Sequence, residues 1–296
     1  MRPMLDIIYR YDPHSAENVQ PPGSVAEARQ RLEQGNRRFA HLLEIDPHAD
    51  VPGPQIIHFS LEDLGIELDG SAPKQQPYAV VLGCSDARVP TEMVFSEACN
   101  SLFVVRVAGN VLGSECLGSV DYAVQHFGHS LKLILVLAHS GCGAVTAAVD
   151  AFIDPARYLA VATSHPVRAI VDRIIVPVRA GAQSLERVWG DDVVHAPGYR
   201  RALIETAVPL SAALTAAVIE HEHLDSDGSG VEVFFSVYDL ASRHVRVPMA
   251  GLSLHSDDEV RLVKPPSDPA EIANLAMQLA GSDYIRELLP QRNNTA

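Results

Sequence analysis

The chain has 296 residues, of which 47% are hydrophobic and 20% are charged. A chain of this length and composition can bury a large core, so wholesale disorder is excluded. The 37 acidic residues outnumber the 23 lysines and arginines, which gives a formal net charge of -14. Because such a charge repels a phosphate backbone, we expect no nucleic-acid partner.

The sequence carries no run of about 18 uncharged apolar residues, and the segment from Met1 to Asp6 lacks the pattern of a secretory signal. We therefore expect a cytoplasmic protein with no membrane partner. Four cysteines are too few for a disulfide scaffold at this length. In a reducing compartment, thiols serve metal binding or catalysis instead.

Prolines and the absence of a sustained period predict an irregular N-terminal arm over residues 1–23. Ser24 followed by Glu27 forms a capping box, and the apolar residues after it recur on one helical face. This pattern predicts a helix that ends at Gly35-Asn36 or beyond. Residues 46–77 contain five prolines and are expected to form mostly a surface loop.

Short, nearly continuous apolar runs follow, and these are typical of strands buried on both faces of a parallel sheet. The crossover between the second and third runs has the spacing of a helix, residues 117–127. The order of strand, helix and strand predicts an α/β fold with a central, mainly parallel sheet flanked by helices. The runs lie at residues 79–82, 102–107, 133–137 and 231–238.

Three more helices are expected, at residues 143–151, 202–223 and 269–279. The last of these lies in a polar, proline-punctuated C-terminal tail, residues 251–296. Its apolar face is able to pack on its own subunit or on a partner, and the sequence does not choose between them.

Polar side chains directly follow two of the predicted buried strands, in the segments 83–88 and 138–143. In open α/β sheets, binding sites lie beyond the carboxyl ends of the strands, so these two loops are expected to converge. His139 and Cys142 are three residues apart and can face the same side of a turn, while Cys84 supplies a second thiolate from the neighbouring strand end. Two sulfurs and one nitrogen suit zinc, and the fourth position left free is typical of a catalytic site with a water or hydroxide on the metal.

Asp86 and Arg88 alternate with Cys84, so an extended backbone directs all three side chains to one side. An arginine grips a carboxylate with two parallel hydrogen bonds and favours its ionised form. Two roles for Asp86 follow: held by Arg88, it orients the zinc-bound hydroxide, and released from Arg88, it becomes the fourth ligand and closes the site.

Two other classes of protein use similar residues. A cysteine phosphatase or sulfurtransferase would use Cys84 as a nucleophile and Arg88 to bind the oxyanion, but its loop has five residues between the two and this chain has three. A structural zinc module would need a fourth protein ligand, and Asp86 is able to provide it. Metal content discriminates the first class from a zinc enzyme, and activity discriminates the second.

The same motifs resemble those of the β-class carbonic anhydrases. The resemblance is strong from residue 24 to 149, weakens over 150–225, and resumes at residues 237–240, which are similar to the edge strand of that family. The segments that carry it are Cys84-Ser85-Asp86-Ala87-Arg88-Val89-Pro90, Arg106-Val107-Ala108-Gly109-Asn110, His139-Ser140-Gly141-Cys142-Gly143 and the helix around Gly35-Asn36-Arg38-Phe39.

The resemblance implies a zinc lyase that reversibly hydrates carbon dioxide to bicarbonate and a proton, in a homodimer or a higher even-numbered oligomer. Its catalytic domain would span residues 24–250, with an enlarged region at 150–230. The same fold can also hydrolyse a related small molecule such as carbon disulfide, or bind zinc without catalysis. Carried over residue by residue, the implied zinc ligands are Cys84, His139 and Cys142, the catalytic pair is Asp86 and Arg88, and the substrate pocket includes Phe103, Tyr122 and Gly143.

The chain departs from the family pattern at one place. Many members have a glutamine shortly after the catalytic pair, where this chain has Glu97 or Ala98. This departure bears on how the substrate is oriented. The two remaining cysteines, Cys99 and Cys116, are expected to be small buried hydrophobic residues, and the other histidines, including the pair at 221 and 223, to be ordinary exposed residues.

Overall fold

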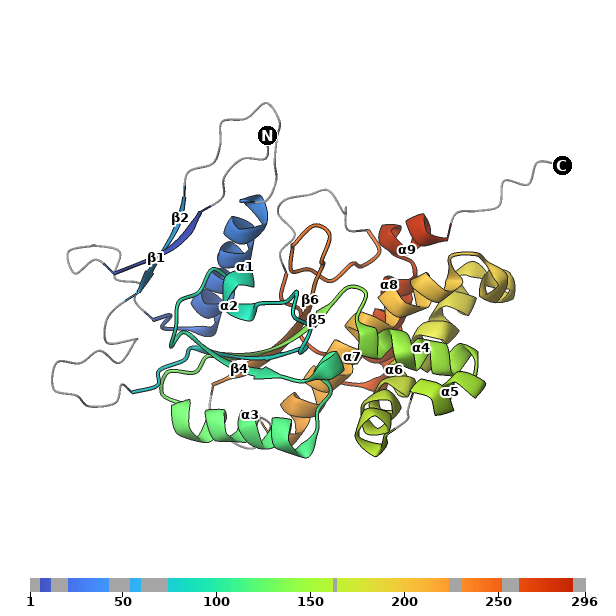
Figure 1. Ribbon diagram of the computed structural model, residues 1–296, viewed down its shortest axis with the longest axis horizontal. Helices are drawn as coiled ribbons and strands as arrows, with labels where there is room; N and C mark the ends of the chain where they lie inside the picture. Colours follow the sequence, from blue (N-terminus) through green and yellow to red (C-terminus); the bar gives the residue numbers. More distant parts are fainter. Residues whose placement is uncertain are drawn as a thin grey trace, which may run out of the picture.

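The computed structural model describes residues 6–11, 21–42, 54–59, 74–161, 164–223, 230–251 and 261–289. Its centre is a four-stranded sheet in the order β4-β3-β5-β6, in which every pairing is parallel (Figure 1). The predicted α/β fold with a central parallel sheet is confirmed. The strands are β3 (Ala79–Gly83), β4 (Leu102–Arg106), β5 (Leu133–His139) and β6 (Glu232–Tyr238).

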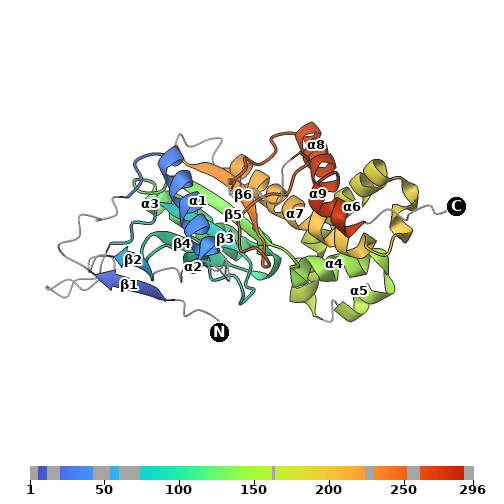
Figure 2. The ribbon, with the colours of Figure 1, turned by 90° about the horizontal axis from the view of Figure 1, so that it is seen from above.

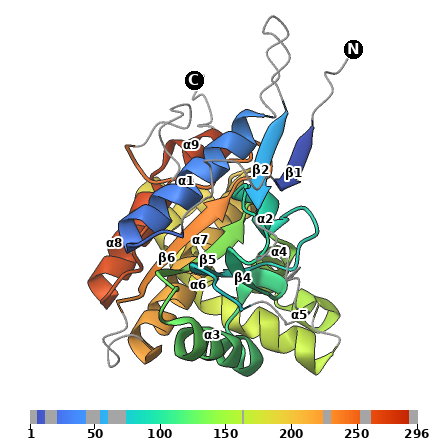
Figure 3. The same ribbon diagram turned by 90° about the vertical axis from the view of Figure 1, so that its left-hand side faces the viewer.

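Helices cover both faces of this sheet, which explains the continuous apolar runs of its strands (Figure 3). On β3, Val80 and Leu82 face the layer of α3 (Ser114–Phe127) and α7 (Tyr199–His223). Ala79 and Val81 face the opposite layer, which is formed by α1 (Val25–His41).

Helices within residues 143–223 and 269–288 together build a helical layer at one end of the molecule (Figure 2). The last two helices, at residues 269–288, pack there against the helices at residues 165–189 and 199–223, so this described part of the C-terminal tail covers its own subunit. The layer consists of α4 (Gly143–Ile153), α5 (Ala156–Val161), α6 (His165–Trp189), η2 (Asp191–His195), α7, α8 (Pro269–Ala280) and α9 (Asp283–Leu288).

Helix α7 is long and apolar enough to cross a membrane by length and composition, over Tyr199–Glu222. In the structure, 78% of its most apolar window is buried inside the protein. It packs on β5, β6 and α6 as a core helix.

Helix α1 begins as the sequence predicts, with the Ser24 side chain accepting a hydrogen bond from the backbone of Glu27. The helix passes through Gly35 and Asn36 without ending. A Cβ atom at Gly35 would lie only 1.9 Å from the carbonyl oxygen of Phe95, so this glycine serves close packing on the loop after α2 (Thr91–Val94). The buried Asn36 side chain bonds to the backbone of Val94, Arg243 and Val245.

Two further strands lie where the sequence suggests an arm and a loop. β1 (Ile7–Tyr11) and β2 (Gln55–Phe59) form a separate parallel pair, beside α1 in Figure 1. The prediction of irregular structure was wrong for residues 7–11, and residues 55–59 form a short strand inside the segment expected to be mostly loop, because each pairs with a segment far away in the sequence. Most of the remaining residues of both segments lie outside the described residues. The prediction of two buried thiols was also wrong, because Cys99 is exposed and Cys116 is half-buried.

Candidate metal centre

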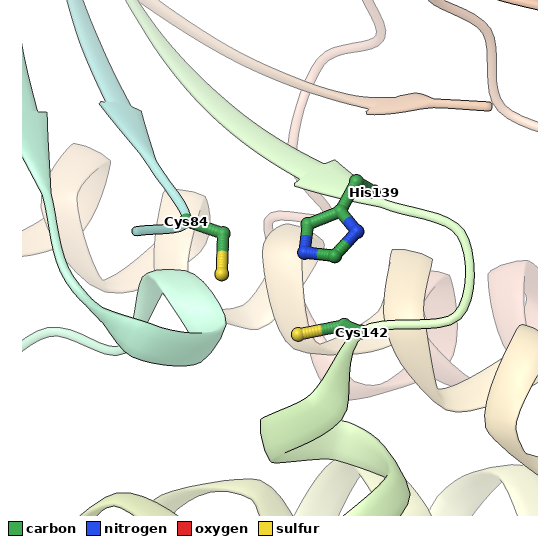
Figure 4. Close-up of side chains that lie close together, drawn as sticks. All are labelled: Cys84, His139 and Cys142. Carbon is green, nitrogen blue, oxygen red and sulfur yellow. The ribbon is translucent and has the colours of Figure 1, made fainter. Parts of the chain in front are cut away.

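Three side chains from two strand ends meet at the carboxyl edge of the sheet. Cys84 follows β3, His139 ends β5, and Cys142 precedes α4, and all three point toward one another (Figure 4). Their ligand atoms lie within 4.8 Å of one another, and all three residues are buried. The convergence that the sequence predicts for these residues is therefore present in the structure.

The ring of His139 is oriented for coordination. Its Nδ1 lies 3.0 Å from the carbonyl oxygen of Ser140, which can only accept, so Nδ1 carries the proton and Nε2 presents its lone pair. Nε2 is buried and has no hydrogen-bond partner within the described residues. A buried polar atom without a partner is costly, and a metal ion at this position would satisfy it.

The two thiols differ in their electrostatic environment. A hydrogen bond from the Cys142 thiol lowers the pKa of Cys84, against the opposing effect of burial. The backbone N–H of Gly109 also donates to Cys84 Sγ, over 3.3 Å. These hydrogen bonds favour the thiolate of Cys84, which is the form that binds metals. With one imidazole and two sulfurs, the donor set fits a metal ion of intermediate softness.

The segment after β4 supports the Cys84 loop from the side. Gly109 lies in η1 (Ala108–Asn110) with φ +68°, and a Cβ there would lie 2.8 Å from the side chain of Ala144. Only glycine allows its N–H to approach the sulfur so closely in this conformation. Arg106 donates from Nε to the carbonyl of Cys84 and from Nη2 to the carbonyl of Asp86, over 3.0 and 2.6 Å.

Asp86 and Arg88 form the pair that the sequence predicts. Arg88 donates to both carboxylate oxygens, over 2.9 and 2.7 Å, and these bonds hold the pKa of Asp86 well below its usual range. The second oxygen of Asp86 lies 3.7 Å from Nε2 of His139. The ionised carboxylate is thus held by the arginine at the edge of the metal centre.

Two carboxylates, the half-buried Asp239 and the buried Glu205, lie behind the loop that carries His139 and Cys142. Asp239 accepts a hydrogen bond from Ser140 Oγ over 3.1 Å, and Glu205 of α7 accepts one from the N–H of Gly141 over 3.1 Å. The sequence analysis missed both contacts. For Glu205 the available signal was a single acidic residue inside a long apolar helix pattern.

The predicted pocket residues separate into two groups. Gly143 begins α4 directly after Cys142, and a Cβ there would meet no atom within 4 Å, so open space adjoins the ligand. Phe103 instead pairs with Val80, three residues before the end of β3, which is about 10 Å along the strand.

The exposed side chain of Tyr122 lies beside Phe103, and within one chain the structure does not bring these two aromatic residues to the metal centre. Glu97, one of the two residues expected in place of the family glutamine, is buried. It is bound by Arg31 and Tyr78, so it does not face the metal centre.

Comparison with known proteins identifies relatives that match more than half of the chain. Carbonic anhydrase 2 of Mycobacterium tuberculosis is 36% identical over 161 residues, which cover 53% of this chain and 66% of that protein. The carbonic anhydrase of Mycolicibacterium smegmatis is 36% identical over 177 residues, which cover 59% of this chain and 75% of that protein. The chain thus spans about two thirds of the length of the first of these relatives.

Among solved structures, the tetrameric β-carbonic anhydrases of Sordaria macrospora align with a TM-score of 0.45 at 18% identity, over 58% of this chain and 81% of theirs. The Coccomyxa β-carbonic anhydrase in complex with acetazolamide aligns with a TM-score of 0.43 at 22% identity, over 60% of this chain and 75% of its own.

A family model described as carbonic anhydrase matches residues 79–243, which is more than half of the chain and includes every residue of the metal centre. The expected relationship to zinc lyases is thereby confirmed at the level of the family. The chain belongs to the carbonic anhydrase family, in its β class.

Proposed function

We propose that this chain binds one zinc ion through Cys84, His139 and Cys142 and catalyses the reversible hydration of carbon dioxide to bicarbonate and a proton. The observation that carries the proposal is the buried cluster of these three ligand atoms, with the carboxylate of Asp86 held 3.7 Å from His139 Nε2. Zinc at such a site supplies a Lewis acid that lowers the pKa of an attacking water toward neutrality.

The residues around the cluster have separate tasks in this reaction. Asp86 is ionised and accepts a hydrogen bond from the attacking water, which aims a lone pair of the water oxygen at the carbon of carbon dioxide. Arg88 keeps the carboxylate in that place by holding both of its oxygens. The open space beside Gly143 leaves room for the substrate next to the ligands.

Zinc content and hydration activity, measured on the same samples, test this proposal. The parent protein should contain one zinc per chain and hydrate carbon dioxide in a stopped-flow assay. Cys142→Ser should lose most of the zinc, whereas the matched control Cys99→Ser, at an exposed thiol outside the cluster, should keep it. Full zinc retention in Cys142→Ser would reject the ligand assignment, and a zinc-loaded parent that acts on carbon disulfide but not on carbon dioxide would reject the substrate.

We also propose that the active form is a cytoplasmic homodimer or a higher even-numbered oligomer. Two features support assembly: β4 is an edge strand that pairs only with β3 in the described residues, and the large apolar side chains of Tyr122, Leu159 and Val176 are exposed. Light scattering tests the assembly, and a stable, zinc-loaded and active monomer at micromolar concentration would contradict it. Cell fractionation tests the compartment.

A further inference from the structure

The loop from His139 to Cys142 carries two of the three ligands, and one side of it is loosely packed. A cavity of about 30 Å³ lies behind the loop, lined among others by Ser140, Glu205, Pro209, Asp239 and Tyr284. Because side chains do not fill this space, hydrogen bonds rather than packing hold the loop from this side.

Each of the two middle residues of the loop has its own hydrogen bond to a carboxylate. Ser140 is fixed by Asp239, by the N–H of Leu240 and by the backbone of Tyr238. Gly141 has φ +62°, and its N–H donates to Oε1 of Glu205. The turn at Gly141 determines how Cys142 is placed relative to His139, so the acceptor of its N–H acts directly on the ligand spacing.

The position of Glu205 is not explained by packing. The residue is 7% exposed and lies in the apolar helix α7, where burial raises the pKa of the carboxyl group. A buried carboxylate is costly unless it is hydrogen-bonded, and the bond to Gly141 opposes the effect of burial. α7 belongs to the region at 150–230, so this contact links that region to the metal centre.

We propose that Glu205 is a positioning residue of the metal centre, which fixes the spacing of His139 and Cys142 by accepting the N–H of Gly141. The inference rests on the proposed zinc site. A partner that orients a ligand from outside the coordination shell typically changes metal affinity about 10- to 100-fold when it is removed.

The test uses the full chain with three variants. Glu205→Met has a similar length but no acceptor, and Glu205→Gln keeps an acceptor oxygen. Thr206→Val changes the neighbouring buried residue, whose hydroxyl donates to the carbonyl of Ala202 within α7. Zinc affinity is measured by competition with a chelator, and the ligand geometry by the absorption spectrum of the cobalt(II)-loaded protein. Urea unfolding reports the stability of each variant separately.

We expect Glu205→Met to bind zinc about 10- to 100-fold more weakly and to change the cobalt spectrum. Glu205→Gln and Thr206→Val should keep the affinity and the spectrum of the parent. A folded Glu205→Met with parental affinity and spectrum would overturn the proposal, and so would a Glu205→Gln that loses as much affinity as Glu205→Met.

Should Glu205→Met fail to fold, Glu205→Asp replaces it, because this variant keeps the charge but is one methylene too short to reach Gly141. Parental zinc affinity and an unchanged cobalt spectrum in Glu205→Asp would also overturn the proposal. A parent protein that binds no zinc would reject the proposed function itself. An active, zinc-loaded parent with unaffected variants would reject only the role of Glu205.

Discussion

The guanidinium of Arg88 donates to both carboxylate oxygens of Asp86, and one of these oxygens lies 3.7 Å from Nε2 of His139. The carboxylate therefore lies between the arginine and the cluster of three candidate ligands, and the two hydrogen bonds from Arg88 hold it on the side of the arginine. Without the arginine, the same carboxylate, which lies next to His139, would be free to become the fourth ligand.

Replacing Arg88 with alanine should lower carbon dioxide hydration at least about 100-fold while leaving the zinc in place, because the freed carboxylate no longer orients the attacking water. Stopped-flow hydration and elemental analysis check the two parts. The matched control is Arg200→Ala, which removes the same bidentate geometry from Asp150, away from the metal centre, and should keep parental activity. An Arg88→Ala protein as fast as the parent would reject the mechanism even with zinc bound.

Hydration should strengthen as the pH rises from 6 to 9. Two thiolates cancel the double charge of zinc, so the metal acidifies the attacking water less. The pKa of this water should therefore lie above the value of about 7 known for sites with three histidines. Asp86 does not contribute to this profile, because its depressed pKa keeps it ionised over the whole range. Stopped-flow hydration across these pH values provides the check, and a flat profile would contradict the charge argument.

The same pair should make the free energy of unfolding depend on pH only in acid. The pKa of Asp86 is lower in the folded protein than the value of about 3.9 in an unfolded chain, so its contribution is present above that value and is lost as the pH falls below it. Urea unfolding at pH 7 and at pH 3, on the parent and on Asp86→Asn, measures the effect. Equal losses of stability in both proteins on acidification would contradict it.

Gly35→Ala should destabilise the protein by at least about 2 kcal/mol, because the added methyl group would collide with the backbone carbonyl of Phe95 and overpack the contact. Gly118→Ala is the matched control, since its Cβ would meet no atom within 4 Å on the exposed side of α3. That change should stabilise by about 0.4 to 1 kcal/mol. The midpoints of urea unfolding measure both changes in stability. Equal shifts of the midpoint in the two variants would contradict the close contact at Gly35.

Arg31→Met should cost about 3 to 5 kcal/mol, because it leaves the buried carboxylate of Glu97 without its cation. Arg29→Met, on the same helix, breaks a more exposed pair with Glu33 and should cost less than about 1 kcal/mol. Thermal or urea unfolding of both variants measures the difference. Similar losses in the two proteins would show that burial does not distinguish the pairs.

The sequence predicts the sheet and the metal ligands because both depend on local patterns. Strands buried on both faces give continuous apolar runs, and the ligands directly follow two of them, so the topology alone brings Cys84 and His139 together. Helix α6 is not predicted, and Pro177 lies inside it. In the structure this proline is buried within the 25-residue helix.

The missed parts depend on contacts between distant segments. β1 and β2 pair across more than forty residues, and neither shows its partner in its own sequence. Gly35 and Asn36 read as a helix end, but their role is set by the loop that lies against them, since Gly35 admits the backbone of Phe95 and Asn36 bonds to Val94. The contact between Glu205 and Gly141 likewise exists only after α7 has packed behind β5.

The burial of α7 also sets an order on synthesis. Much of its apolar surface is covered by β6 and α8, and both of these follow it in the chain. A nascent chain therefore presents this helix before its covering elements have left the ribosome, and a protein truncated after residue 223 would expose it permanently. We therefore expect chaperone binding and aggregation during expression mainly while α7 has been synthesised and β6 and α8 have not. At that point an apolar helix long enough to span a membrane is exposed.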